Sequence, residues 1–300
     1  MQSLIAQRHL GSNQANASTR MNRLASGFRI NKAADDAAGL AISENLRADI
    51  RSLAQAQRNA NDSIALLQVA EGGLQEITNI MVRLKELSIQ AASDTIGPKE
   101  RDYLNREFMA LKHEIDRTAI STEYNGTRLL VGNKEMDEQL LDGHNPSPLE
   151  FQVGKDYFLP PDSLDAPNPI NIIRADFSKM NATLSGEGSL DIGEPEDEDG
   201  TTIASKVGAQ SSIARLDEAL EKVASYRASI GAIQNRLTST DKGLSVSIEN
   251  LTGAKSRIKD ADFALESAEF TQANILTQSG ASVLSQANQL PNIALKLLNS

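Results

Sequence analysis

Two stretches of the chain carry apolar residues at a strict seven-residue spacing, and an acidic, proline-containing middle separates them. The first consists of Leu46, Leu53, Ala60, Leu67, Leu74 and Met81, and the second of Leu216, Val223, Ile230, Leu237, Leu244, Leu251 and Ile258. Further apolar positions accompany each series, namely Ile50, Ile64, Ala70, Ile77 and Leu84 in the first and Ile213, Leu220 and Ile248 in the second. This repeat is typical of helices that lie against other helices.

The lengths of the two stretches predict how they pair. At about 1.5 Å per residue, a helix over residues 44–93 would span roughly 75 Å and one over 203–259 roughly 85 Å. Matching lengths predict two antiparallel halves with the middle as the turnaround. We therefore expect a mostly α fold, a long antiparallel helical rod or coiled-coil bundle built from both chain ends, with a small β-hairpin insert.

Composition favours a narrow bundle. Aromatic residues make up 4% of the chain, and there is no Trp, so few large side chains are available for a thick globular core. The absence of Cys excludes disulfides, thiolate metal sites and a cysteine nucleophile. No run of about 18 apolar residues occurs, which argues against a membrane span.

The excess negative charge lies in the middle of the chain. Residues 131–200 contain 16 acidic and 4 basic residues; the chain totals of 40 and 30 leave 24 acidic and 26 basic residues elsewhere. We expect a near-neutral body that packs closely against other copies and an acidic middle that faces solvent. Replacing this middle by a short linker is then expected to preserve assembly. Nucleic acid is not an expected partner, because no basic stripe is present.

The two chain ends share an unusual composition. Residues 1–37 are rich in Gln, Asn, Ser and Ala, and Phe270 to Leu295 contain no charged residue although many are polar. Neutral polar groups can be buried among copies without the desolvation cost of ions. We expect both ends to be the mutual contact surface of an assembly, disordered until it forms. The N-terminus lacks the pattern of a secretory signal, so export is expected to use another route.

Local signals predict where helices and turns begin. Asp35 or Asp36 is expected to cap the first long helix, and Gly97-Pro98 to end it and start another. Gly72-Gly73 within the first helix indicates either close backbone approach, a bend or a weak point. Asn125-Gly126 predicts a turn, 149–153 and 170–177 predict a hairpin, and 194–199 predicts a solvated acidic loop.

No catalytic, cofactor or metal site is predicted. His113-Glu114 begins like a zinc-peptidase helix, but Arg117 stands where the second His is required. Asp260 and Asp262 lack the glycine and distal glutamate of a calcium loop. An enzyme is not expected, because the chain also lacks a phosphate-binding glycine loop and a nucleophile motif.

Several segments resemble bacterial flagellins, in the order found in that family. The longest is SGFRINKAADDAAGLAI from Ser26 to Ile42. Others are NAND (59–62), AEG (70–72), RLKEL (83–87), EIDR (114–117), RASIGA (227–232), QNR (234–236), SRIKDAD (256–262) and QANQ (286–289). The resemblance covers roughly residues 3–130 and 203–300.

The resemblance implies a structural subunit that assembles itself into the extracellular bacterial flagellar filament for motility and is exported by the flagellar type III route. It implies tube segments at 1–37 and 260–300, rod segments at 38–135 and 203–259, and a variable acidic insert with a β-hairpin at 136–202. A hook–filament junction protein is the alternative, and self-polymerisation of the purified chain would distinguish them.

The resemblance also implies partners: other copies, cap and junction proteins, an export chaperone on the C-terminal segment and a vertebrate innate immune receptor. Candidate receptor contacts are Arg83, Leu87 and Glu107. Candidate residues for self-assembly and chaperone binding are Leu4, Leu10, Leu24, Ile275, Leu276, Val283, Leu284, Leu290, Leu295 and Leu298.

Overall fold

The computed structural model describes residues 2–132, 148–156, 170–177, 180–184, 189–193 and 201–298, with side chains from residue 3 to 288 within these ranges. Its elements are α1 (Gln2–Ser26), α2 (Ala37–Ala91), α3 (Pro98–Ser121), β1 (Glu123–Tyr124), β2 (Thr127–Arg128), β3 (Leu149–Gln152), β4 (Ile172–Ala175), α4 (Lys206–Lys259) and α5 (Phe263–Leu298). They form two compact units, unit 1 (Met1–Arg51 with Ser247–Ser300) and unit 2 (Ser52–Val246). The division falls within α2 and α4.

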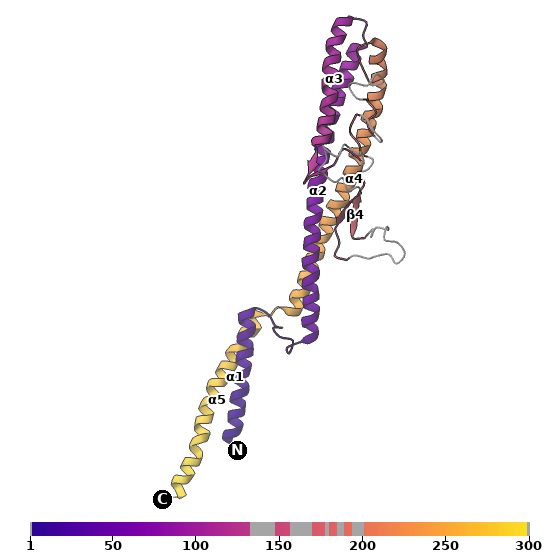
Figure 1. Ribbon diagram of the computed structural model, residues 1–300. Helices are drawn as coiled ribbons and strands as arrows, with labels where there is room; N and C mark the ends of the chain where they lie inside the picture. Colours follow the sequence, from indigo (N-terminus) through magenta and orange to yellow (C-terminus); the bar gives the residue numbers. More distant parts are fainter. Residues whose placement is uncertain are drawn as a thin grey trace, which may run out of the picture. The chain divides into compact units, whose positions relative to one another are not determined.

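In unit 2, α2 and α4 are antiparallel, as predicted. Gln57 Nε2 donates to Ser245 Oγ at 2.7 Å, and Lys85 pairs with Asp217. Residues later in α2 thus pair with residues earlier in α4, as antiparallel helices require. In Figure 1 these two helices and α3 lie side by side.

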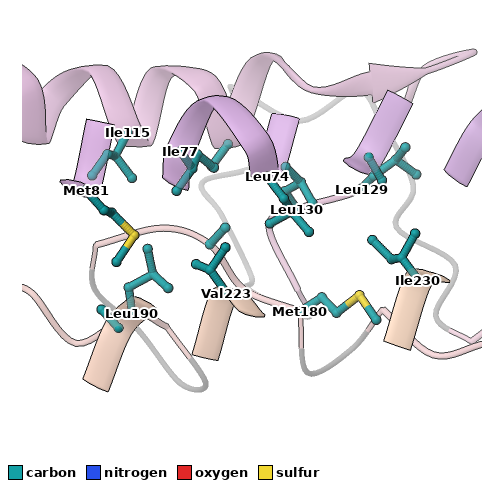
Figure 2. Packing of buried hydrophobic residues seen from close by; sticks show 14 of the residues in the cluster. Leu74, Ile77, Met81, Ile115, Leu129, Leu130, Met180, Leu190, Val223 and Ile230 are labelled. Atoms are coloured by element: carbon teal, nitrogen blue, oxygen red, sulfur yellow. The ribbon is translucent and has the colours of Figure 1, made fainter. Parts of the chain in front are cut away.

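The seven-residue repeats form the core of unit 2. Ala60, Leu67, Leu74 and Met81 of α2 are fully buried, and Leu216, Val223, Ile230 and Leu237 of α4 are buried opposite them. From α3, Phe108 and Ile115 join the same cluster. Figure 2 shows the layer in which Ile77 and Met81 approach Ile115 and Val223. The predicted helical bundle is confirmed.

The connection from α2 to α3 follows its turn signals. Pro98 occupies the first position of α3, where its missing N–H costs nothing. Arg101 then reaches back, and its guanidinium donates to the carbonyl oxygens of Ala91 at 2.8 Å and Ile96 at 3.1 Å. Because the last carbonyls of a helix lack partners within it, Arg101 stabilises the end of α2.

The predicted turn and the predicted hairpin are both present. Asn125 (φ 51°) and Gly126 (φ 78°) join β1 to β2 through two left-handed residues, as a two-residue hairpin turn requires. Strands β3 and β4 are antiparallel, with Phe151 opposite Ile173. Asn59 Nδ2 of α2 donates to the carbonyl of Gln152 at 3.1 Å and fixes β3 against the helix.

The expectation that the middle of the chain faces solvent is wrong for much of its described part. Large apolar side chains from β3 to the start of α4 are buried in the same core as the helices, as Figure 2 shows for Met180 and Leu190. Those in this core are Phe151, Val153, Ile173, Phe177, Met180, Leu184, Leu190 and Ile192, and Ile172 is buried outside the cluster. The net charge of the segment conceals this apolar content. The acidic run at 194–199 lies outside the described residues.

Two polar side chains of α3 hold this returning segment. Lys112 is fully buried, and its Nζ donates to the carbonyls of Ile192 at 3.4 Å and Thr201 at 3.2 Å. Asp116 Oδ1 accepts from the amide of Leu184 at 2.9 Å. Buried polar groups require such partners, so α3 specifies where the segment packs.

The two glycines within α2 have different surroundings. A Cβ at Gly73 would lie 2.5 Å from Thr122 Oγ1 and 2.8 Å from Leu130 Cδ1, whereas a Cβ at Gly72 would meet nothing within 4 Å. The prediction of close backbone approach is thus confirmed at Gly73 and not at Gly72.

This pair gives a matched test in one helix turn. We expect Gly73→Ala to destabilise the chain by about 1–3 kcal/mol, because Thr122 and Leu130 must move. Gly72→Ala should stabilise it by up to about 1 kcal/mol through helix propensity. Urea unfolding of both variants measures the difference; equal effects would contradict the packing described for Gly73.

In unit 1, the helices α2 and α5 each begin with an aspartate N-cap. Asp36 Oδ1 accepts from the amide of Gly39 at 2.8 Å and caps α2, while Asp262 Oδ1 accepts from Ala264 at 2.9 Å and caps α5. Asp35 instead accepts from the amides of Lys32 and Asn31, and these hydrogen bonds lower its pKa. Of the two predicted candidates, Asp36 is the cap.

The segments entering and leaving the terminal helices are joined to each other. Arg29 N donates to the carbonyl of Lys259 at 2.7 Å, Ala261 N donates to that of Gly27 at 2.9 Å, and Phe28 forms an antiparallel bridge with Asp260. Lys259 Nζ also lies 5.2 Å from the ring centroid of Phe28. These contacts align the end of α1 with the start of α5.

Candidate assembly surface

Helices α1 and α5 form an antiparallel pair. Their Cα atoms approach within 8 Å along the pair, and Figure 1 shows both helices side by side with the two chain ends at the same end of unit 1. Ser3 Oγ donates to Asn288 Oδ1 at 2.7 Å near the termini, and Arg20 pairs with Glu266 near the other end. Such close approach requires small side chains between the helices.

The face of α5 that packs on α1 is mainly small or polar. Buried and half-buried positions recur every three or four residues, at Glu266, Phe270, Ala273, Thr277, Gly280 and Leu284. The corresponding positions of α1 are Ser3, Ala6, Leu10, Asn13, Ala17, Arg20 and Leu24. A Cβ at Gly280 would lie 3.4 Å from Leu10 Cδ1, so the Leu10 side chain of α1 packs against α5 at this glycine.

The solvent-facing surface of the pair also carries large apolar side chains. Large side chains that remain exposed on it are Leu4, Ile5 and Met21 of α1 and Phe263, Leu265, Ile275, Leu276 and Val283 of α5. Beside them, α5 has a shallow groove of about 610 Å³, lined by Ala264, Ser267, Ala268, Thr271, Gln272, Ile275 and Leu276. Exposed apolar surface bordering a groove is typical of protein interaction sites.

The candidate assembly residues therefore fall into three groups. Leu4, Ile275, Leu276 and Val283 are exposed. Leu10, Leu24 and Leu284 are half-buried within the helix pair. The side chains of Leu290, Leu295 and Leu298 lie outside the described residues. Disorder of these ends before assembly stays a prediction.

An ion-pair cluster joins the two helices. Glu266 is 4% exposed, and its carboxylate accepts from Arg20 at 2.9 Å and from Arg23 at 3.1 Å. Arg20 also contacts Glu269 at 2.7 Å. Burial acts to raise the pKa of Glu266, but the hydrogen bonds from Arg20 and Arg23 outweigh it, so its pKa is lowered. This charged cluster was not predicted from the sequence.

Acid is expected to weaken the α1–α5 pair through this cluster. Because the pKa of Glu266 is lower in the folded state, its contribution to stability is complete only above the ordinary Glu value of about 4.5 and is lost as the pH falls through the lowered value. Protonation removes the negative charge that Glu266 presents to Arg20 and Arg23, and Arg20 keeps only Glu269. Hydrogen exchange of α5 amides at pH 5 and pH 3 measures the loss. Glu266→Gln should remove this part of the pH dependence; an unchanged profile would contradict its assignment to Glu266.

The three candidate receptor residues are not all on the surface. Arg83 of α2 and Glu107 of α3 are exposed and joined by a 2.8 Å ion pair, and Arg83 also contacts Glu86 at 3.1 Å. Hydrogen bonds to these two carboxylates raise the pKa of Arg83, and the bond to Glu107 has the larger effect. Leu87 is fully buried in the core of unit 2. The structure brings Arg83 and Glu107 together and places Leu87 beneath the surface.

Two of the remaining polar candidates have structural roles. In the ranges that the structure describes, no group of three or more His, Cys, Asp or Glu side chains is arranged to hold a metal ion. Over the same residues, none of the helices combines the length and hydropathy that crossing a membrane requires. Asp36 and Asp262 cap helices, and His113 is exposed on α3.

These features define a helical structural protein with a large exposed apolar face on its terminal helix pair. The family model for the bacterial flagellin N-terminal helical region matches residues 1–135, and that for the bacterial flagellin C-terminal helical region matches residues 213–298. The chain belongs to the bacterial flagellin family and is a structural subunit of the bacterial flagellar filament.

Individual relatives match almost from end to end. The flagellar filament 33 kDa core protein of Treponema phagedenis is 39% identical, with 99% of this chain and 98% of the relative covered. Flagellin of Bacillus subtilis is 41% identical, with 96% and 95% covered. The crystal structure of Bacillus cereus flagellin has a TM-score of 0.47 and 26% identity, over 62% of this chain and 88% of that one.

Proposed function

We propose that copies of this chain polymerise through the α1–α5 pair, with residues 1–37 and 260–300 forming an inner tube. Residues 38–135 and 203–259 then form the surrounding rod, which carries the 136–202 segment. The observation that supports this proposal is the exposed apolar face of α5, on a helix without charges from Phe270 to Leu295. A neutral face can be buried among copies without desolvating ions.

Polymerisation of the purified chain tests this proposal. We expect the chain alone, refolded from denaturant, to grow into long filaments visible by electron microscopy once short seeds are supplied. A hook–filament junction protein would instead form short or no polymers by itself. Absence of filaments over a range of protein and salt concentrations would overturn self-polymerisation.

Export by the flagellar type III route is part of the same proposal. An exposed apolar face would promote aggregation before assembly. We propose that an export chaperone covers Leu276 and Leu284 and the neighbouring C-terminal residues until the subunit is incorporated. Cap and junction proteins would then meet the filament at its ends. The role proposed for this chain is structural and not catalytic.

The surface around Arg83 and Glu107 is proposed as a contact for a vertebrate innate immune receptor. Leu87 would contribute by holding α2 against α3 and α4, since it is buried below this surface. Arg83 presents a guanidinium whose position is fixed by Glu107 and Glu86. Arginine at such a site is a frequent energetic anchor of protein interfaces.

Arg83→Ala is expected to reduce activation of receptor-bearing cells by soluble chain at least about tenfold. Arg117→Ala is the matched control, because Arg117 is also exposed and paired with a carboxylate, that of Glu114. Exposed ion pairs contribute little to stability, so neither variant should unfold. Equal activity of native chain, Arg83→Ala and Arg117→Ala would overturn the receptor proposal.

A further inference from the structure

A groove in unit 2 lies between the returning segment and α4. It has a volume of about 500 Å³ and is lined by Arg174 of β4, by Asp176 just after β4, by Met180 and by five residues of α4. The α4 residues are Ser225, Tyr226, Ser229, Ile233 and Arg236. Apart from the apolar side chains of Met180 and Ile233, most of these residues carry hydroxyl or guanidinium groups that donate hydrogen bonds. The groove therefore suits a ligand that is rich in hydrogen-bond acceptors.

Arg236 is the cation that this groove offers to a ligand. Arg236 is exposed, and within the described residues its guanidinium forms no hydrogen bond or ion pair. Other exposed arginines of unit 2 have carboxylate partners, as Arg174 has in Glu150 at 2.7 Å and Arg106 has in Asp102 at 3.0 Å. A guanidinium presents a planar fork of donors that matches a carboxylate. The groove is therefore suited to a ligand that carries carboxylates.

We propose that this groove holds the acidic run, residues 194–199, of a second copy of the chain. The run contains five carboxylates in six residues. The 16 acids against 4 basic residues in 131–200 would repel one another between neighbouring copies unless they met cations. Because each copy carries both the run and the groove, the contact is heterologous and can repeat along a polymer. The inference rests on the proposed polymerisation, which brings the copies together.

The lengths of the groove and of the acidic run agree. Ser225, Ser229 and Arg236 share one face of α4, and the first and last of them are about 16 Å apart at 1.5 Å per residue. A six-residue segment in extended form spans about 17 Å. Ser229 Oγ donates to the carbonyl of Ser225 at 3.1 Å, whereas the Ser225 hydroxyl has no partner among the described residues. Carboxylates of one extended run can thus meet Ser225 at one end of the groove and Arg236 at the other.

The acidic run of the same copy is too far away to occupy this groove. Thr201 N donates to the carbonyl of Ile192 at 2.9 Å, so the segment between them starts and ends at one place. That place is beside the start of α4, because Ser212 Oγ donates to the carbonyl of Thr202 at 3.2 Å. Ser225 lies 13 residues beyond Ser212, which is about 20 Å along the helix. Seven residues fixed at both ends project at most about 12 Å, half of their extended length. The occupant must therefore come from another copy.

Binding of a synthetic peptide to the soluble full-length chain tests this inference. The probe is a fluorescent peptide with the sequence of residues 193–201, and fluorescence anisotropy measures its Kd at low salt, where exposed charges are least screened. We expect saturable binding to the native chain, and no binding of a peptide whose five acids are replaced by Gln and Asn. Arg236→Gln should weaken binding about two- to fivefold, the effect of one exposed ion pair.

Two matched variants make the result specific. Asp176→Asn removes the carboxylate that lines the groove and should tighten binding about two- to fivefold. Arg106→Gln removes an exposed arginine of α3 outside the groove and should leave the Kd unchanged. No binding to the native chain, equal binding by Arg236→Gln, or equal binding of the neutral peptide would overturn the inference. Failure of the native chain to polymerise would instead overturn the proposed function, because the peptide requires only a folded unit 2.

Discussion

A chain ending at Lys259 is expected to form no filaments, while unit 2 stays folded. The truncation removes α5, which carries the groove and the exposed side chains of Leu265, Ile275, Leu276 and Val283. It also removes the partner of α1, and a 25-residue helix rich in Ser, Asn and Gln is marginal alone in water. Among the described residues, by contrast, the core cluster of unit 2 extends along α4 only to Leu237, within the part that the truncation keeps.

Two measurements separate loss of assembly from loss of folding. Electron microscopy and sedimentation should show no polymer from the truncated chain, even with seeds. Urea unfolding followed through the helical signal of unit 2 should keep its midpoint, with stability within about 0.5 kcal/mol of the intact chain. Normal filaments would contradict the role given to α5, and loss of the unit 2 transition would show that the two units fold together.

The helical part of the fold could be predicted because its signals are local and periodic. The spacing of Leu67, Leu74 and Met81 determines which side of α2 is buried, and this side is the same whatever helix covers it. Asp36, Gly97-Pro98 and Asn125-Gly126 act through backbone geometry within a few residues. Each of these signals needed no knowledge of the rest of the chain.

Features that depend on distant partners could not be predicted. Glu266 is the last acid but one before an uncharged run, which gives no hint that Arg20 and Arg23, more than 240 residues earlier, will surround it. Lys112 reads as a solvated residue within the charged α3 but is buried against carbonyls of the returning segment. Leu87 was placed on a candidate surface by resemblance, while its position beside Leu84 and Ser88 in α2 puts it in the core.

The middle of the chain shows why net charge is a poor guide to burial. Sixteen acids in residues 131–200 suggested a solvent-facing insert, yet charged and apolar residues alternate there in short segments. In β4, Ile172, Ile173 and Ala175 are buried while Arg174 is exposed and pairs with Glu150. Alternation over two to four residues lets one segment face water and the core at once.

Replacing residues 131–200 by a short linker is therefore expected to unfold unit 2, contrary to the expectation from charge alone. The replacement removes nine large buried side chains, from Phe151 to Ile192. At about 1.5–3 kcal/mol each, their burial contributes roughly 14–27 kcal/mol. A domain has a net stability of only about 5–15 kcal/mol. The replacement also uncovers the apolar face of α3 beside Lys112, and it removes the Ile192 carbonyl to which the Lys112 ammonium donates. Circular dichroism and urea unfolding measure the result; a cooperative transition within about 2 kcal/mol of the native one would contradict it.

A matched pair of point variants tests the same conclusion without removing the segment. Ile173→Ala should cost about 2–5 kcal/mol, because Ile173 is 6% exposed and packs in the cluster that contains Phe151. Ile170→Ala, three residues earlier and 79% exposed, should change stability by less than about 0.5 kcal/mol. Small effects of both would mean that the hairpin lies on the helices without supporting them. A large effect of Ile173→Ala alone would make the acidic middle part of the core on which the helices of unit 2 depend.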